Sequence, residues 1–140
     1  MAEYTAILEQ TVAANSNVLL TETPVDGGRC VVHREGAGLV TLRGITNQCR
    51  SRYRVLFNGN IAVLTGGTVG AISLAISLNG EAIQSTTMIV TPAAVENYFN
   101  VSASVYVDVP NGCCTQVAIR NTSDQAILVQ NANLIVERVA

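Results

Sequence analysis

Residues that favour turns interrupt this chain about every ten positions, and no segment between them sustains a helical period. Clear turn signals are Asp26-Gly27-Gly28, Asn79-Gly80 and Pro110-Asn111-Gly112. Between the turns, apolar residues alternate with polar ones, as in residues 71–78 and 101–109. A period of two is typical of half-buried strands, and closely spaced turns are typical of sandwiches and barrels. The pattern therefore predicts an all-β fold of about ten short antiparallel strands.

The turns divide the chain into expected elements. Asn58-Gly59-Asn60 is interpreted as a turn between two strands, and one helical turn is expected at residues 95–98. Residues 1–16 are expected to form an arm or a first edge strand, and residues 17–140 one sandwich or barrel domain. The expected strands span residues 17–22, 29–34, 39–43, 52–57, 61–65, 71–78, 82–90, 101–109 and 113–121, with one or two more in 126–139.

The composition is unusually poor in charge. Charged residues make up 13% of the 140 positions, about half of the ~25% usual for soluble domains, and 49% are hydrophobic. This excludes intrinsic disorder, and no apolar run approaches the ~20 residues that a membrane-spanning helix needs. A surface this apolar is most simply buried against copies of the same chain, which predicts a homo-oligomer. The net charge of −2 gives no electrostatic case for nucleic acid or an anionic membrane.

All eight basic residues are arginines, and six of them lie between residues 29 and 54. One interpretation is that they occupy solvated strand faces and form ion pairs between subunits. The other is a patch that binds an anion or a partner, for which the candidates are Arg43, Arg50, Arg52 and Arg54.

The sequence carries no recognisable catalytic motif. Its single histidine, His33, lies in an apolar strand, where a packed residue is the simpler interpretation than a metal-binding trio at a threefold axis. Cys30, Cys49, Cys113 and Cys114 do not have zinc-site spacing, so buried thiols are expected. A Cys30–Cys49 bridge and a redox or metal role for the Cys113-Cys114 pair stay open. We therefore expect no enzyme activity, no metal and no cofactor.

Four segments resemble the C1q/TNF-like jelly-roll superfamily, in particular its bacterial and bacteriophage members. YRVLFNGN at residues 53–60 resembles the central strand, and AISLNGE at 75–81 a characteristic hairpin. VPNG at 109–112 resembles a family turn, and NANLIVERV at 131–139 the last strand. The resemblance covers residues 17–140 and implies that they form one jelly-roll domain. It departs from the family at Cys113, where an aspartate is common, and in residues 44–52, which exceed the usual short turn.

The resemblance implies a compact homotrimer in which an inner sheet of each subunit faces a threefold axis. Aromatic side chains on that sheet would supply much of the interface, although about half of the candidates are expected to fill the core instead. The candidates for the trimer interface are Tyr53, Phe57, Tyr98, Phe99 and Tyr106.

The resemblance also suggests a function. Family members with collagen repeats use this head to nucleate a triple helix, but this sequence contains no Gly-x-y run. We expect a phage virion component, a head-decoration, head-fibre or tail-associated protein that docks on a capsid or tail protein through residues 1–14 or one end of the sandwich. The alternative is a trimeric host-surface or carbohydrate-binding module of a bacterial surface or spore coat. A cupin-like enzyme is a third possibility, which the single histidine disfavours. The N-terminus lacks the pattern of a secretory signal peptide.

Overall fold

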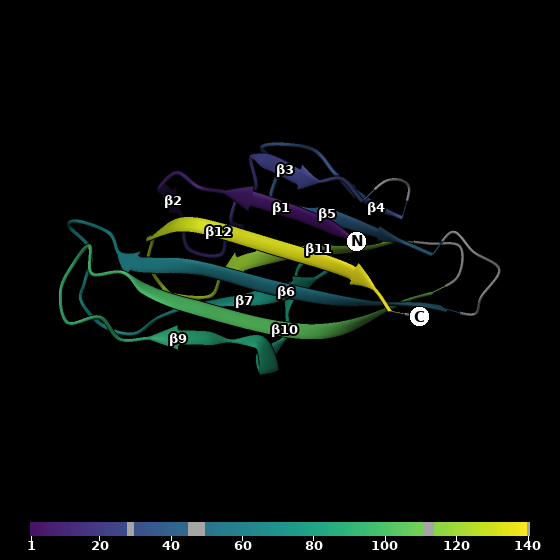
Figure 1. The fold of residues 1–140 in the computed structure, drawn as a ribbon. Helices are drawn as coiled ribbons and strands as arrows, with labels where there is room; N and C mark the ends of the chain where they lie inside the picture. Colours follow the sequence, from purple (N-terminus) through teal and green to yellow (C-terminus); the bar gives the residue numbers. More distant parts are fainter. Residues whose placement is uncertain (28–29, 45–49, 111–113, 140) are drawn as a thin grey trace.

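The computed structural model describes residues 1–27, 30–44, 50–110 and 114–139, which form two packed antiparallel sheets of six strands each. Sheet A has the order β10-β6-β12-β1-β3, with β2 beside β12, and sheet B has the order β4-β5-β11-β7-β8, with β9 beside β7. Figure 1 looks onto sheet A, with β7 and β11 of sheet B behind it. The strands of sheet A are β1 (Ala2–Ala6), β2 (Gln10–Val12), β3 (Glu22–Val25), β6 (Arg50–Val63), β10 (Phe99–Pro110) and β12 (Ile127–Arg138). Those of sheet B are β4 (Val31–His33), β5 (Val40–Arg43), β7 (Ile72–Leu78), β8 (Glu81–Ala82), β9 (Met88–Val90) and β11 (Cys114–Asn121).

The core lies between the two sheets and is built from alternate residues of each strand. Phe57 and Leu134 contribute from sheet A, and Leu42, Ile76 and Ile119 from sheet B, and all are essentially inaccessible to solvent. Burying large aliphatic and aromatic side chains stabilises a fold by roughly 1.5–3 kcal/mol each. The all-β sandwich expected from the alternation is therefore confirmed.

The longest strand, β6, runs through the segment that the sequence suggested was a turn. It pairs with β10 on one side and β12 on the other, so Asn58 and Asn60 lie within a continuous strand. Gly59 faces the core, and a Cβ atom there would lie 3.0 Å from Cζ of Phe57. The glycine therefore makes room for the Phe57 ring, and pairing on both edges overrides the turn preference of the local sequence.

Around β7 the predictions were right for the hairpin and wrong for its second strand. Asn79 and Gly80 form the tight turn with φ of 52° and 87°, as the type I′ preference requires. The expected strand at 82–90 is divided into β8, a 3₁₀ turn η1 (Gln84–Thr86) and β9. The Thr86 hydroxyl explains the break, because it donates to the Ile83 carbonyl at 2.7 Å and accepts from Ile76 N at 2.9 Å. Residues 95–98 form no helix.

The N-terminal strand β1 is neither an arm nor an edge strand. β1 lies inside sheet A between β12 and β3, and β2 pairs with β12. Ala2, Tyr4 and Ala6 point into the core and are buried. The first strand was expected at residues 17–22, but that stretch contributes only the isolated bridges Asn17–Arg120 and Leu20–Ala37 before β3 begins at Glu22. Deleting residues 1–14 would therefore remove part of the core along with any docking segment.

Candidate functional site

The solvent-facing side of sheet A carries a row of exposed and half-buried side chains on each of its central strands, and we call it the open face. Its strands are β10, β6, β12 and β1, which lie side by side in Figure 1. The face is formed by the alternate residues of these strands that point away from the core. The strand register aligns these residues in rows that cross the sheet. The open face comprises Asn100, Ser102, Ser104, Tyr106 and Asp108 of β10, Arg52, Arg54, Leu56, Asn58 and Asn60 of β6, Gln130, Asn133, Ile135 and Glu137 of β12, and Glu3 and Thr5 of β1.

One end of the open face is charged. Tyr106, Arg54 and Glu137 share a row, with Arg54 Nη2 3.9 Å from Glu137 Oε2. In the next row, Arg52 donates to both carboxylate oxygens of Asp108, at 2.7 and 3.1 Å. This hydrogen bonding, together with the charge of Asp108, raises the pKa of the Arg52 guanidinium above its usual value. The arginines of the open face are thus matched by acids of the same chain.

The other half of the open face carries side-chain amides. Asn100 Nδ2 donates to Oδ1 of Asn58 at 2.9 Å and to Oδ1 of Asn60 at 3.1 Å. Asn133 Nδ2 donates to Glu3 Oε2 at 2.5 Å. These bonds connect β10 to β6 and β12 to β1 across the surface. The amide half therefore presents an ordered array of polar groups.

A small apolar strip separates the charged and amide halves. Leu56 and Ile135 are paired neighbours at its centre, flanked by Ser104 on β10 and Glu3 on β1. Both aliphatic side chains are half-buried, and Tyr106 in the adjacent row is 64% exposed. An exposed tyrosine beside aliphatic side chains is the kind of group that anchors protein interfaces.

Two of the five aromatic residues expected at a trimer interface lie in the core instead. Tyr53 and Phe57 are 0% exposed and point toward sheet B, so they have no surface to offer a partner. The Tyr53 hydroxyl donates to the Arg43 carbonyl at 2.9 Å, which connects the two sheets, and burial raises the pKa of this hydroxyl. The physical reason is parity: odd-numbered residues of this part of β6 face inward. The core-filling alternative therefore holds for these two.

Tyr98 and Phe99 lie at the start of β10, at the left-hand end of sheet A in Figure 1. The Tyr98 hydroxyl donates to Glu9 Oε2 in the turn between β1 and β2, so this side chain is engaged within its own chain. Burial, and then this hydrogen bond, raise the pKa of the Tyr98 hydroxyl. Phe99 is partly exposed. Of the five candidates, Tyr106 alone projects from the middle of the open face.

The structure does not gather the candidate arginines into one patch. Arg52 and Arg54 lie on the open face, whereas Arg43 lies on β5 of sheet B. The side chain of Arg50 lies outside the described residues. Arg52 and Arg54 lie on a solvated strand face, as the first interpretation expects, but their ion pairs with Asp108 and Glu137 are within the chain and not between subunits.

His33 serves a packing role. Its Nδ1 lies 3.0 Å from the Leu39 carbonyl oxygen and its Nε2 lies 2.9 Å from that of Leu20, and its ring lies 4.6 Å from the ring of Tyr4. Both ring nitrogens are thus occupied by the backbone. Among the described residues, no group of three His, Cys, Asp or Glu side chains could hold a metal ion. Nor does that part of the chain contain a helix long and apolar enough to cross a membrane.

Of the four cysteines, Cys30 is half-buried and Cys114 is exposed, both as free thiols. The exposure of Cys114 departs from the expected buried thiol. Cys49 and Cys113 lie outside the described residues, and with them the expected alternatives of a Cys30–Cys49 bridge and a Cys113-Cys114 site.

Comparison with solved structures places this architecture among known folds. The globular domain of zebrafish complement 1qA superposes with a TM-score of 0.64 at 11% identity, over 96% of this chain and 94% of that chain. Murine APRIL at pH 5.0 gives 0.61 at 11% identity, over 97% and 98%. PRD1 vertex protein P5 gives 0.52 at 13% identity, over 99% and 97%. The chain has a C1q/TNF-like jelly-roll fold. No family model and no curated protein matches the sequence.

Sequence reasoning missed most of the polar residues on the open face of this jelly roll. Asn58 and Asn60 were assigned to a turn, and Asn100, Leu56 and Ile135 were not singled out. A signal was present, because the apolar residues at 53, 55 and 57 predict that Arg54 and Leu56 face the other way. Following that alternation along β6 would have identified the face, though not its pairing with β10 and β12.

Proposed function

We propose that this protein is a non-enzymatic structural protein that assembles as a homotrimer through the open face of sheet A and forms part of a phage virion. The observation that carries the proposal is the open face itself, on which the exposed Tyr106 borders the half-buried pair Leu56 and Ile135. The low charge of the chain adds to it, because a surface poor in charge favours burial against copies of itself.

The virion assignment is supported by the fold and by the surroundings of the histidine. PRD1 vertex protein P5 is a phage protein, and it shares the fold over nearly the full length of both chains. Both nitrogens of the only histidine lie within 3.0 Å of backbone carbonyl oxygens, so the ring is packed against its own chain. A rigid sandwich with a self-association surface fits a particle component better than an enzyme.

The mass of the purified chain, measured by light scattering in reductant, tests the assembly. We expect three times the chain mass of 14.7 kDa. Tyr106→Arg should give single chains, because three guanidinium groups would meet near the axis. Ile89→Arg is the matched control, since Ile89 on β9 of sheet B is also 64% exposed, and it should leave the trimer intact. A monomeric wild-type chain, or a Tyr106→Arg trimer of unchanged mass, would contradict the proposal.

Membership of a virion requires a separate measurement. The particles to test are those of the phage whose genome encodes the chain, purified on a density gradient. Mass spectrometry of these particles should detect the chain at a constant ratio to the major capsid protein. Its absence from such particles would overturn the virion assignment while leaving the trimer in place.

A further inference from the structure

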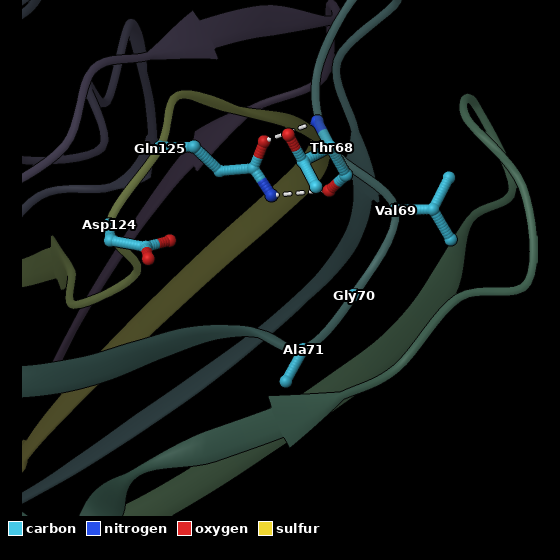
Figure 2. Close-up of a pocket in the computed structure, with 6 residues that line it drawn as sticks. All are labelled: Thr68, Val69, Gly70, Ala71, Asp124 and Gln125. Carbon is cyan, nitrogen blue, oxygen red and sulfur yellow. Dashed lines mark hydrogen bonds between the residues drawn. The ribbon is translucent and has the colours of Figure 1, made fainter.

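A pocket of about 340 Å³ lies between two loops at the end of the sandwich where β6 ends. One wall is the segment of residues 68–71, which connects β6 to β7, and the other is formed by Asp124 and Gln125 in the loop between β11 and β12. Figure 2 shows the Asp124 side chain pointing toward the space beside Gly70 and Ala71, whereas the Val69 side chain points away from Asp124. The pocket is therefore bounded by one carboxylate and a stretch of backbone.

The two walls are held rigidly together. The Gln125 amide accepts from Thr68 N at 2.9 Å and donates to the Thr68 carbonyl at 2.7 Å, as a paired strand would (Figure 2). Gly67 is needed for this contact, because a Cβ there would lie 2.8 Å from Gln125 Oε1. The buried Asn121 fixes the second loop by donating to the Gln125 carbonyl at 2.9 Å and accepting from Ser123 N at 2.9 Å. A ligand would meet a preformed site, which lowers the entropy lost on binding.

The groups that line the pocket are available to a ligand. Asp124 is exposed and forms no ion pair or hydrogen bond with another described residue. The backbone N–H and carbonyl groups of Val69 and Gly70 likewise have no partner within the part of the chain that the structure describes. The site thus combines a charged acceptor with free backbone donors and acceptors.

A carboxylate beside free backbone groups favours some classes of ligand over others. The carboxylate disfavours anions, and the lining is more polar than an apolar ligand would need. A calcium ion prefers six to eight oxygen ligands, and the described residues contain no acidic cluster. Sugar hydroxyl groups both donate and accept, so they match a carboxylate facing backbone amides. The volume lies at the lower end of the roughly 300–1,000 Å³ of small-molecule sites, which suits a single sugar ring.

We propose that the pocket formed by residues 68–71, Asp124 and Gln125 binds one neutral monosaccharide unit of a glycan. Asp124 would accept hydrogen bonds from its hydroxyl groups, and the backbone of Val69 and Gly70 would bind its other oxygens. The pocket lies outside the open face, so this inference holds for a single chain and does not depend on the trimer. In a trimer, three such pockets would bind a multivalent glycan with avidity.

The test is a titration of the ¹⁵N-labelled full chain with glucose, galactose, mannose and N-acetylglucosamine, observed by NMR. At least one sugar should shift the amide signals of residues 68–71 and 124–125 at millimolar concentration.

Gly70→Phe should abolish these shifts without disturbing the fold, because a Cβ at Gly70 meets nothing within 4 Å and the residue does not have a positive φ. Asp124→Asn should weaken binding about tenfold or more, since a charged acceptor is lost. Glu35→Gln, an exposed acid in the β4–β5 turn, is the matched control and should bind like wild type.

Three outcomes would overturn the proposal. None of the sugars shifts these amides at 50 mM, or the shifts persist in Gly70→Phe, or calcium chloride alone shifts them and the sugars do not. The mass of Gly70→Phe, measured by light scattering, should equal that of wild type in every case, which separates this test from that of the trimer.

Discussion

The central strands of the two sheets differ in how exposed their outward side chains are to solvent. In β6 of sheet A, Tyr53, Val55 and Phe57 are buried against the core, whereas Arg54 and Asn58 on the other side are exposed. In the middle of β7 of sheet B, at residues 74–77, both faces are inaccessible to solvent. The core-facing residues of β7 are Ile72, Leu74 and Ile76, and the outward ones Ala75 and Ser77 are 0% and 2% exposed.

The difference shows where the fold can meet a partner. The outward residues of β7 are small and already covered by the chain, so sheet B has no side chain at this position with which to bind another protein. The outward residues of β6 are large and polar, and they remain accessible after folding. A search for function on this jelly roll therefore starts at sheet A, and the comparison of β6 with β7 predicts how substitutions on each face will behave.

The largest effect is expected from the inward face of β6. Phe57→Ala should reduce the free energy of unfolding by about 3–5 kcal/mol, because it leaves a cavity beside Gly59 in the centre of the core. Tyr106→Ala, on the open face, should change it by less than about 0.5 kcal/mol when the two chains are compared as monomers. Urea denaturation followed by circular dichroism measures both. Equal losses would mean that Tyr106 contributes to the core of its own chain.

A smaller effect should distinguish the two outward faces. Ala75→Leu inserts a large side chain into the covered face of β7 and should cost about 1–3 kcal/mol of stability. Ser102→Leu makes a similar enlargement on the exposed face of sheet A, and its cost should stay within about 0.5 kcal/mol. Both values come from urea denaturation in the Tyr106→Arg background, so that single chains are compared and the exposed face of sheet A is in water. If Ala75→Leu were as mild as Ser102→Leu, the outward face of β7 would have room for a partner after all.

High pH should lower the free energy of unfolding through Tyr4, which lies on the inward side of sheet A. Burial, with a contribution from the charge of Asp26, raises the pKa of Tyr4 to about 12 from 10.0. The unfolded chain then releases this proton at lower pH than the native one, so stability falls as pH rises from about 10 to 12. Tyr4→Phe removes the Tyr4 contribution, and its midpoint of urea unfolding should depend less steeply on pH above 10. An unchanged slope would show that other groups control alkaline unfolding.

The alternation of apolar residues predicted the sandwich, the strands β7 and β10 and the Asn79-Gly80 hairpin, because those features depend on neighbours in the sequence. The continuity of β6 could not be predicted in this way. It depends on β10 and β12, which are distant in sequence and pair with both edges of Asn58 and Asn60. The same holds for β1, whose place between β12 and β3 needs partners more than 120 and about 20 positions away.

For the candidate site, choosing aromatic residues by type was less informative than choosing them by parity. Tyr53 and Phe57 share the odd positions of Val55, and Tyr106 falls between the inward Val105 and Val107, so alternation already separated core from surface. The pocket at residues 68–71 carried no such signal. It arises where the Gln125 side chain imitates a paired strand across 57 positions, a contact that no local pattern encodes.

The smallest effect concerns the amide half of the open face. Asn100 donates to both Asn58 and Asn60, but all three lie at the surface, where water can replace the lost bonds. Asn100→Ala should therefore reduce the free energy of unfolding by less than about 1 kcal/mol. Ser102→Ala, one pair further along β10, serves as the control and should be neutral. Urea denaturation of both variants in the Tyr106→Arg background, in which the open face is in water, resolves the difference. A loss above about 2 kcal/mol for Asn100→Ala would mean that the amides hold β10 to β6. The open face would then resemble the covered face of β7 more than a surface left free for partners.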